Sequence, residues 1–213
     1  MGSTAAKHTI VCLSGVGGSP REWDRVAPRL AAFGVVGTAV PEHGPLILVG
    51  HSQGGVEALR IAAGQPDRVG AVILTSSFFP PARAGRSRAA AALDYVHHRV
   101  LYVRERAAGR RAPRPTWRGA RQMAAVARLG IRPSAYHRLA GAVRCPVLVI
   151  HGDRDHVVPV AFARAAAAAH PGWTLRELRA AGHRPHQDGP QAWADVATGW
   201  LAGVIAGSEP PPS

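Results

Sequence analysis

The ten residues Leu46-Ile-Leu-Val-Gly-His-Ser-Gln-Gly-Gly55 decide the fold that this sequence predicts. Their first half is a run of apolar residues, which is typical of a strand buried on both faces of a sheet. Their second half matches Gly-x-Ser-x-Gly, in which glycines permit a turn so tight that the serine hydroxyl projects above the sheet edge. Because a helical pattern follows, we expect a strand, a sharp turn and a helix, with Ser52 as a candidate nucleophile. A glycine-rich turn without chemistry is the alternative.

The same alternation of strands and helices extends on both sides of this segment. Strands are predicted at residues 8–13, 35–40, 46–49, 69–75, 146–150 and 173–178. Helices are predicted at residues 20–33, 53–64, 160–169 and 190–205. Such alternation indicates an α/β fold with a mostly parallel sheet of about six strands and helices on both faces.

The first of these helices carries a recognisable start signal. Ser19-Pro-Arg-Glu22 offers a serine N-cap, a proline at the first helical position and a glutamate three residues after the serine. This combination is a capping box. We therefore expect one helix from this point to about residue 33, ending before Gly34.

A serine hydroxyl becomes a good nucleophile only when a base takes its proton and a carboxylate orients that base. Asp155 lies in the loop after the fifth predicted strand, and His183 follows Gly182 in the segment after the sixth. Both therefore lie at the carboxyl ends of strands, where parallel sheets present their sites. Asp153 and His186 are alternatives, but the spacing of each motif favours Asp155 and His183.

Acyl transfer also needs backbone N–H groups that stabilise the developing oxyanion. Gln53, directly after the candidate nucleophile, is predicted to supply one, and Val16 in the loop after the first strand is predicted to supply another. The pair His183-x-x-His186 also raises the question of a metal. Because no thiol and no helical His-Glu-x-x-His accompany it, we predict neither a metal nor a cofactor.

Length and composition limit the class of protein. The chain has 213 residues, enough for one domain with an insert, and its two cysteines predict buried thiols in a reducing compartment rather than a disulfide framework. No apolar run reaches the roughly 18 residues of a membrane span. The first residues lack the apolar core of a signal peptide, so a cytoplasmic protein is expected.

The net charge of +13 belongs to one internal segment. Residues 80–144 hold 15 arginines against only Asp94 and Glu105, whereas the rest of the chain has 11 basic and 11 acidic side chains. Three interpretations remain: an arginine-rich solvated surface, attraction of an anionic substrate or lipid surface, and nucleic-acid binding. The last is the weakest, since no zinc, helix-turn-helix or stacking module accompanies the arginines.

This charged segment predicts a domain organisation. We assign residues 1–79 and 145–206 to the α/β core, 80–144 to an arginine-rich helical insert and 207–213 to a disordered tail. Within the insert, helices are predicted near 87–108, 117–129 and 134–142. Its aromatic residues either line an acyl pocket or, as we favour, pack within the insert; they are Tyr95, Tyr102, Trp117 and Tyr136.

Four motifs in this order resemble the α/β-hydrolase superfamily. They begin at Leu13, Gly50, His151 and Gly182, and the similarity covers residues 9–203, with the insert matching only in position. The resemblance implies esterase- or lipase-like hydrolysis of a small carboxylic ester through a serine acyl-enzyme, without a cofactor. It also implies a helical cap over the site. A non-catalytic binding protein, C–C bond hydrolysis and perhydrolysis are the alternatives.

Three departures from the family accompany this resemblance. Ser14 replaces a histidine that is frequent in the oxyanion loop, and the sheet is shorter than usual. Between Val40 and Leu46 the family has a helix of a dozen or more residues, where this chain has five. A parallel crossover normally needs about a dozen residues. We therefore expect either that 35–40 is not a proper parallel strand or that the sheet is rearranged, with apolar sheet exposed where the helix is missing.

Overall fold

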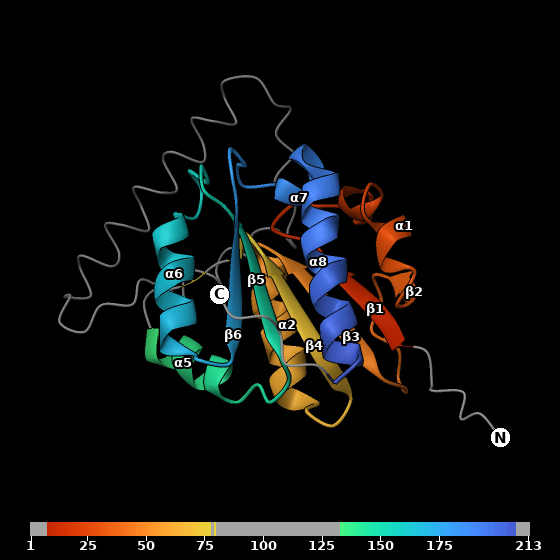
Figure 1. Cartoon of the computed structure of the whole chain (residues 1–213). Helices are drawn as coiled ribbons and strands as arrows, with labels where there is room; N and C mark the ends of the chain where they lie inside the picture. The colour runs from red at the N-terminus through yellow and green to blue at the C-terminus, as the bar shows by residue number, and fades with distance from the viewer. Residues whose placement is uncertain (1–7, 78, 80–132, 208–213) are drawn as a thin grey trace.

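A computed structural model describes residues 8–77, 79 and 133–207 of the chain. These residues form one six-stranded sheet, in which every neighbouring pair of strands is parallel and the order is β2-β1-β3-β4-β5-β6 (Figure 1). The strands are β1 (His8–Leu13), β2 (Gly34–Gly37), β3 (Leu46–His51), β4 (Val69–Thr75), β5 (Val147–Gly152) and β6 (Trp173–Leu178). The predicted α/β fold with a parallel sheet of six strands is confirmed.

Helices cover both faces of the sheet. One face packs against α2 (Gln53–Gly64), α5 (Pro133–Gly141) and α6 (Val160–Ala169). The other packs against η1 (Pro20–Trp23), α1 (Ala27–Leu30) and α8 (Pro190–Ile205), and α8 crosses in front of the sheet in Figure 1. In α8 the buried residues Trp193, Ala197, Trp200 and Leu201 recur at helical spacing, which gives the helix one apolar face against the strands.

The helix predicted from residue 20 to residue 33 is wrong as a continuous element. The chain forms the short 3-10 helix η1, a turn, and then α1, which has Pro28 in its first turn. Proline has no N–H and clashes with the preceding turn, so it is tolerated only where a helix begins. The capping box is also absent, because the Ser19 side chain makes no capping hydrogen bond and Glu22 is buried.

The short connection between β2 and β3 leaves the sheet in the expected order, with β2 and β3 on either side of β1. Gly37 is level with Val11 of β1, and Leu46 is level with Thr9. The two ends are therefore only two residues apart along the sheet and two strands across, a gap of roughly 12 Å. The eight residues from 38 to 45 span it easily. The sheet is therefore not rearranged, and the expectation that 35–40 is not a full parallel strand holds only for residues 38–40, because β2 ends at Gly37.

The expected exposure of apolar residues at this connection is confirmed. Residues 38–45 contain no helix, and the exposed fractions of Val35 and Val40 are 65% and 39%. Val35 is paired with Thr9, whereas its neighbour Val36 packs against the core on the side of α1 and α8. The uncovered face of β2 is therefore the face that α2 covers further along the sheet.

Helix α5 lies within the range 80–144 that the sequence assigns to the insert. It packs against α2, and the Tyr136 ring is buried in the core 6.3 Å from the ring of Phe79. The predicted helices at 87–108 and 117–129 lie outside the described residues, as do Tyr95, Tyr102 and Trp117. The extent of the insert and its role as a cap therefore stay predictions.

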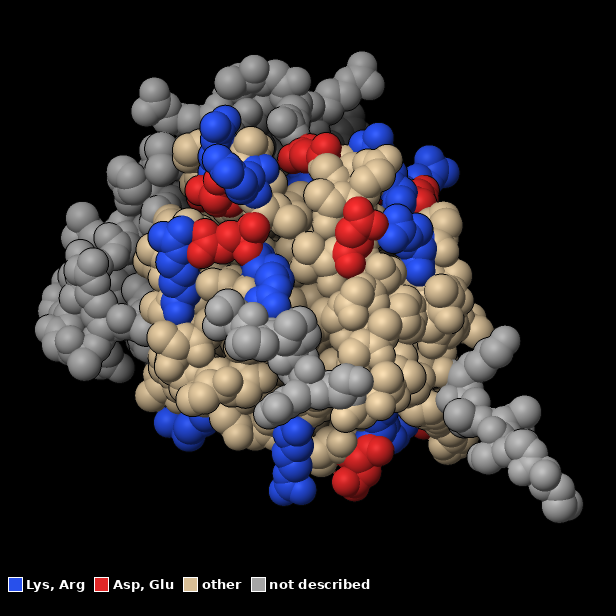
Figure 2. Space-filling model, viewed as in Figure 1, with Lys and Arg blue, Asp and Glu red and all other residues tan. Residues whose placement is uncertain are grey.

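Charges of both signs are interspersed on the face of the molecule that Figure 2 shows. Exposed ion pairs join α1 to α8 through Arg29 and Asp195, at 2.7 Å, and α6 to β6 through Arg164 and Glu177, at 2.6 Å. No helix in the described part of the chain is long and apolar enough to span a membrane. This mixture of charges matches the neutral balance that the sequence has outside residues 80–144.

Both cysteines are free thiols, as predicted. Cys12 in β1 is buried, and burial together with the charge of Glu22 raises its pKa to about 12. Cys145 precedes β5 and is half-buried, and burial raises its pKa to about 11. Neither thiol is therefore ionised to a useful extent near neutral pH.

Candidate active site

Ser52 occupies the sharp turn between β3 and α2. Its backbone angles, φ 53° and ψ −119°, lie outside the regions that non-glycine residues normally adopt. A Cβ at Gly50 would lie 2.5 Å from the Gly54 carbonyl oxygen, and one at Gly54 would lie 2.1 Å from the Leu13 carbonyl oxygen. Both glycines are therefore required by close backbone contacts. This is the strained turn that the Gly-x-Ser-x-Gly pattern predicts.

Neighbouring strands hold the strained turn in place. The Ser52 N–H donates to the Thr75 carbonyl at the end of β4, at 3.0 Å. The Ser77 hydroxyl donates to the Ser52 carbonyl, also at 3.0 Å, and Ser77 is fully buried. Backbone strain of this kind persists only where the surroundings over-determine it. These two hydrogen bonds supply part of that constraint.

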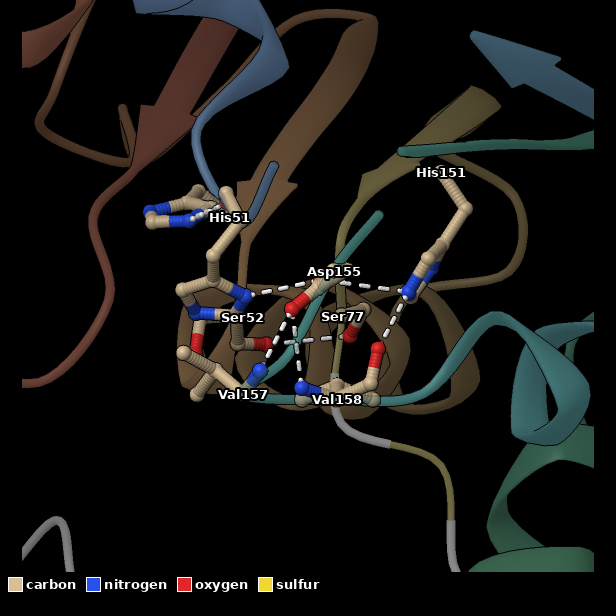
Figure 3. A network of polar contacts seen from close by, with 8 residues as sticks. His51, Ser52, Ser77, His151, Asp155, Val157 and Val158 are labelled. Carbon is tan, nitrogen blue, oxygen red and sulfur yellow. Dashed lines mark hydrogen bonds and ion pairs between the residues drawn. The ribbon is translucent and has the colours of Figure 1, made fainter. Parts of the chain in front are cut away.

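Asp155 and His183 form a hydrogen-bonded pair at the carboxyl ends of β5 and β6. His183 Nδ1 lies 2.9 Å from Asp155 Oδ2. The other carboxylate oxygen, Oδ1, accepts hydrogen bonds from the N–H groups of Val157 at 2.8 Å and Val158 at 2.9 Å. Figure 3 shows these contacts converging on the carboxylate from the loop after β5. The loop therefore fixes the orientation of the carboxylate, which in turn orients the imidazole.

His151 supports the same carboxylate from the opposite side (Figure 3). Its Nε2 lies 2.8 Å from the Val158 carbonyl oxygen and 3.2 Å from Asp155 Oδ2, and the side chain is fully buried. Burial alone would raise the pKa of Asp155, but the charges and hydrogen bonds of His183 and His151 outweigh burial and hold this pKa well below its usual value. The carboxylate is therefore ionised throughout the neutral range.

His183 lies beside the turn that carries Ser52. Its carbonyl oxygen is 3.0 Å from His51 Nε2, and the two imidazole rings are 5.0 Å apart between centroids. Burial lowers the pKa of His183, while the charge and hydrogen bond of Asp155 act in the opposite direction and only partly offset it. The imidazole is consequently neutral at pH 7 and can accept a proton, which a general base must do.

The loop after β1 lies against the same turn. A Cβ at Gly15 would lie 3.0 Å from the Ser52 Cβ and 3.2 Å from His51 Nδ1, so this loop passes directly beside the serine. The Ser14 hydroxyl donates to the Ser19 carbonyl at 3.1 Å and so links the two ends of this loop. Val16 follows in the turn of this loop, and Gln53 is the first residue of α2, whose N–H has no intrahelical acceptor.

The two alternatives that the sequence left open have different surroundings. Asp153 is exposed, and its N–H donates to the Leu178 carbonyl. His186 in α7 (Pro185–Asp188) is fully buried, and its ring is stacked on Trp23 at 4.6 Å between centroids. The structure therefore brings Asp155 and His183 together and leaves Asp153 and His186 outside the pair.

Sequence reasoning missed three residues that surround this site. Ser77 and His151 hold Ser52 and Asp155, and Glu22 lies buried 3.5 Å from His51 Nδ1. His151 had a usable signal, since a histidine that ends a fully apolar strand is buried with it. Ser77 and Glu22 had none, because their contacts depend on how separate segments pack.

The arrangement is suited to nucleophilic catalysis on a carbonyl compound. It has a serine on a strained turn, a neutral imidazole beside that turn, an ionised carboxylate on the imidazole and a backbone loop packed closely against the serine. These side chains come from loops at the carboxyl ends of neighbouring strands, which limits their motion relative to one another.

Comparison with known proteins gives a matching family and a curated relative. Residues 3–196 match the family model described as the alpha/beta hydrolase family. A curated relative, pimeloyl-[acyl-carrier protein] methyl ester esterase of Chromobacterium violaceum, is 30% identical over 201 residues. That match covers 83% of this chain and 76% of the relative.

Solved structures share the fold at low sequence identity. The structure of lip1 from Acinetobacter baumannii AYE has a TM-score of 0.69 and 18% identity, and the match covers 97% of this chain and 87% of that chain. A carboxylesterase structure from Nitrososphaera gargenis has a TM-score of 0.67 and 18% identity, with 97% and 93% covered. At this identity the likeness supports the fold alone.

Proposed function

This chain belongs to the alpha/beta hydrolase family, and we propose that it is a serine hydrolase that cleaves small carboxylic esters through an acyl-enzyme. The single observation that carries the proposal is the hydrogen bond of 2.9 Å between His183 Nδ1 and Asp155 Oδ2, beside the strained turn of Ser52. A carboxylate on Nδ1 leaves Nε2 as the basic nitrogen of the neutral ring, which is the form a general base needs.

In the first half of the proposed reaction, His183 Nε2 takes the proton of the Ser52 hydroxyl as its oxygen attacks the ester carbonyl. The carbonyl π pair moves onto oxygen, and the N–H groups of Gln53 and Val16 stabilise the resulting oxyanion. When the intermediate collapses, the bond to the alcohol oxygen breaks and imidazolium His183 returns the proton to the leaving alkoxide. Asp155 stabilises the imidazolium without taking a proton itself.

In the second half, water replaces the alcohol. His183 takes a proton from water, the hydroxide attacks the acyl carbon, and the oxyanion forms again in the same place. Collapse breaks the bond to the Ser52 oxygen, which recovers the proton from His183 and releases the carboxylic acid. Since every proton is passed through one imidazole, the proposed reaction requires no cofactor.

The curated relative suggests which esters to test. It is named for a methyl ester on an acyl-carrier protein, so methyl esters belong in the substrate panel beside p-nitrophenyl acetate and butyrate. The arginine-rich segment 80–144 would favour substrates with a negative charge elsewhere in the molecule. A charged and a neutral methyl ester of similar length, assayed at low and high salt, separate this preference from the chemistry.

The decisive variant is Ser52→Ala. Loss of a nucleophile in a triad typically lowers turnover by about 10⁴–10⁶-fold, so hydrolysis should fall to the background rate. The matched control is Ser134→Ala, which removes an exposed hydroxyl from α5 and should leave kcat unchanged. Equal rates for wild type and Ser52→Ala would contradict the assignment.

A fluorophosphonate probe distinguishes an enzyme from a binding protein on the same scaffold. The probe should label wild-type protein at Ser52, identified by peptide mass spectrometry, and should not label Ser52→Ala. Absence of labelling in wild-type protein with a normal thermal unfolding transition would favour the binding protein.

A further inference from the structure

Three buried side chains with metal-binding atoms meet behind the strained turn. They are Glu22 from η1, His51 from the end of β3 and His186 from α7, with exposed fractions of 6%, 3% and 0%. One ligand atom from each lies within 4.8 Å of the other two. The cluster lies outside the proposed triad, and the reaction described above uses none of its side chains.

Four polar atoms of this cluster have no hydrogen-bond partner. Glu22 Oε1, His51 Nδ1 and both ring nitrogens of His186 are buried without one. A buried polar atom that lacks a partner costs roughly 1–3 kcal/mol. Unpartnered buried atoms this close together call for an explanation, and a bound ion is one that would satisfy them.

The hydrogen bonding of His51 shows which ring nitrogen faces the cluster. His51 Nε2 lies 3.0 Å from the His183 carbonyl oxygen, which can only accept, so Nε2 is assigned as the donor. The other ring nitrogen, Nδ1, faces Glu22 Oε1 at 3.5 Å. A cation bound by both atoms would satisfy them together in this buried site.

The spacing suits a shared metal ion better than a shared proton. Two ligand atoms bound at about 2.0–2.1 Å to a tetrahedral zinc ion lie about 3.4 Å apart. The distance between Glu22 Oε1 and His51 Nδ1 is 3.5 Å, and the geometry there is not that of a hydrogen bond. The N–H of a zinc-bound histidine is commonly donated to a backbone carbonyl, as the His51 Nε2 proton is here.

His186 would provide the third ligand, and its ring is fixed by packing. Trp23 stacks on its ring at 4.6 Å between centroids, and the His51 ring is 4.7 Å away. Both of its ring nitrogens are buried without a hydrogen-bond partner, so one of them is available to bind an ion.

From this geometry we propose that Glu22, His51 and His186 form a binding site for Zn²⁺. Two imidazoles and one carboxylate are ligands that zinc prefers, and a water molecule would complete a tetrahedral set. The ion would tie together the segment after β1, the turn of Ser52 and the segment that follows His183. Its role would be structural, since no ligand belongs to the proposed triad.

The test uses the full-length protein, freed of metal with a chelator and then dialysed. Addition of ZnSO4 should leave one equivalent of zinc on the protein after desalting, measured by mass spectrometry of the metal. At a hundredfold excess over Kd it should raise Tm by roughly 5–10 °C. Co²⁺ in place of zinc should give the intense visible absorption bands of a tetrahedral site.

Paired variants separate this site from surface histidines. Glu22→Gln and His186→Gln should each lose the retained zinc, the rise in Tm and the tetrahedral Co²⁺ bands. Glu57→Gln and His43→Gln change solvent-accessible residues of the same types and should keep all three.

The proposal is overturned if wild-type protein retains no zinc, which would mean that a proton occupies the cluster. It is equally overturned if Glu22→Gln and His186→Gln retain zinc as wild type does. Should neither variant fold, the Co²⁺ spectrum of wild type decides alone, because weak octahedral bands or none contradict a tetrahedral site. None of these measurements depends on ester hydrolysis.

Discussion

At the scale of single residues, the Asp155 carboxylate connects the scaffold to the proposed chemistry. One oxygen accepts two backbone N–H groups of its own loop, and the other contacts His183 and His151. An asparagine in this position keeps the shape but offers an N–H₂ group where an acceptor is needed. The imidazole would then hold its proton on the wrong nitrogen.

We therefore expect Asp155→Asn to lower kcat by about 10⁴-fold, with little change in KM, because ground-state binding does not use the tautomer. Steady-state kinetics with p-nitrophenyl butyrate measures this loss. Asp153→Asn is the matched control, since Asp153 is exposed and should keep full activity. A similar loss in both variants would mean that Asp155 has no special role.

Residues with local signals could be predicted, and residues whose contacts are distant could not. Ser52 could be singled out because the strained turn requires glycines at fixed neighbours in the chain. Asp155 and His183 could be singled out because each lies in the segment that follows a strand. Glu22 was predicted to cap a helix because of its spacing from Ser19, but it is buried beside His51 at the end of β3. That contact joins separate segments of the chain and has no local signal.

At the scale of elements, the loop after β1 is packed tightly against the turn of Ser52. Even one methyl group on Gly15 would touch the Ser52 Cβ at 3.0 Å and His51 Nδ1 at 3.2 Å. Contacts this close require the loop or the serine to move by several tenths of an ångström. The N–H groups proposed for the oxyanion would move with it.

Gly15→Ala should accordingly lower kcat by on the order of 10²-fold, similar to the loss of one oxyanion donor. Gly172→Ala, where an added Cβ meets nothing within 4 Å, is the control and should retain activity. Single-turnover kinetics of acylation reports this effect. Normal acylation in Gly15→Ala would show that the loop has room to adapt.

The connection between β2 and β3 is held by the side chain of Arg68, which precedes β4 at the end of the sheet away from the proposed site. Arg68 donates to the Pro41 carbonyl at 2.9 Å and to the Gly44 carbonyl at 3.1 Å, and its backbone carbonyl accepts from Leu46. Because arginine has several donors in a fixed plane, it can hold two carbonyls of one loop at the same time.

Arg68→Ala should lower the free energy of unfolding by roughly 1–3 kcal/mol and leave kcat unchanged, because the proposed site is at the other end of the strands. Urea unfolding of Arg68→Ala and of the control Arg60→Ala tests this expectation. Arg60 forms an exposed pair with Glu57, whose loss should cost less than about 1 kcal/mol. Equal stability of the two variants would contradict the role of Arg68.

The errors at the scale of elements have physical causes. The predicted helix 20–33 is interrupted before Pro28, because proline is tolerated only in the first turn of a helix. Pro28 is visible in the sequence, so this break could have been predicted. The five residues between Val40 and Leu46 seemed too few for a parallel crossover only because the second strand was predicted to extend to Val40. Strand length at a sheet edge depends on register with β1, which residue patterns do not reveal.

At the scale of the whole molecule, stability should depend on pH through Asp155. Its pKa is lower in the folded protein than the ordinary value of 3.8. The stabilisation from its ionised form is therefore fully present above pH 3.8 and decreases as the pH falls below it, since the unfolded chain then binds the proton more readily.

Urea unfolding of wild type and Asp155→Asn, measured at several pH values, should show this dependence in the difference between their free energies of unfolding. The stability difference between the two proteins should be constant between pH 7 and about pH 5 and should shrink below about pH 4. A difference that stays constant down to pH 3 would mean that folding does not lower the pKa of Asp155.

The short connection between β2 and β3 has a consequence for protein engineering. Glu22 of the proposed zinc site lies in η1, which precedes this connection in the chain, and every other residue of the proposed triad and zinc site lies in or after β3. The connection therefore lacks a helix without the loss of any of these residues. Grafting residues 38–45 and Arg68 into a larger relative should therefore miniaturise that enzyme at the sheet edge. The uncovered Val35 would be the first position to redesign for solubility.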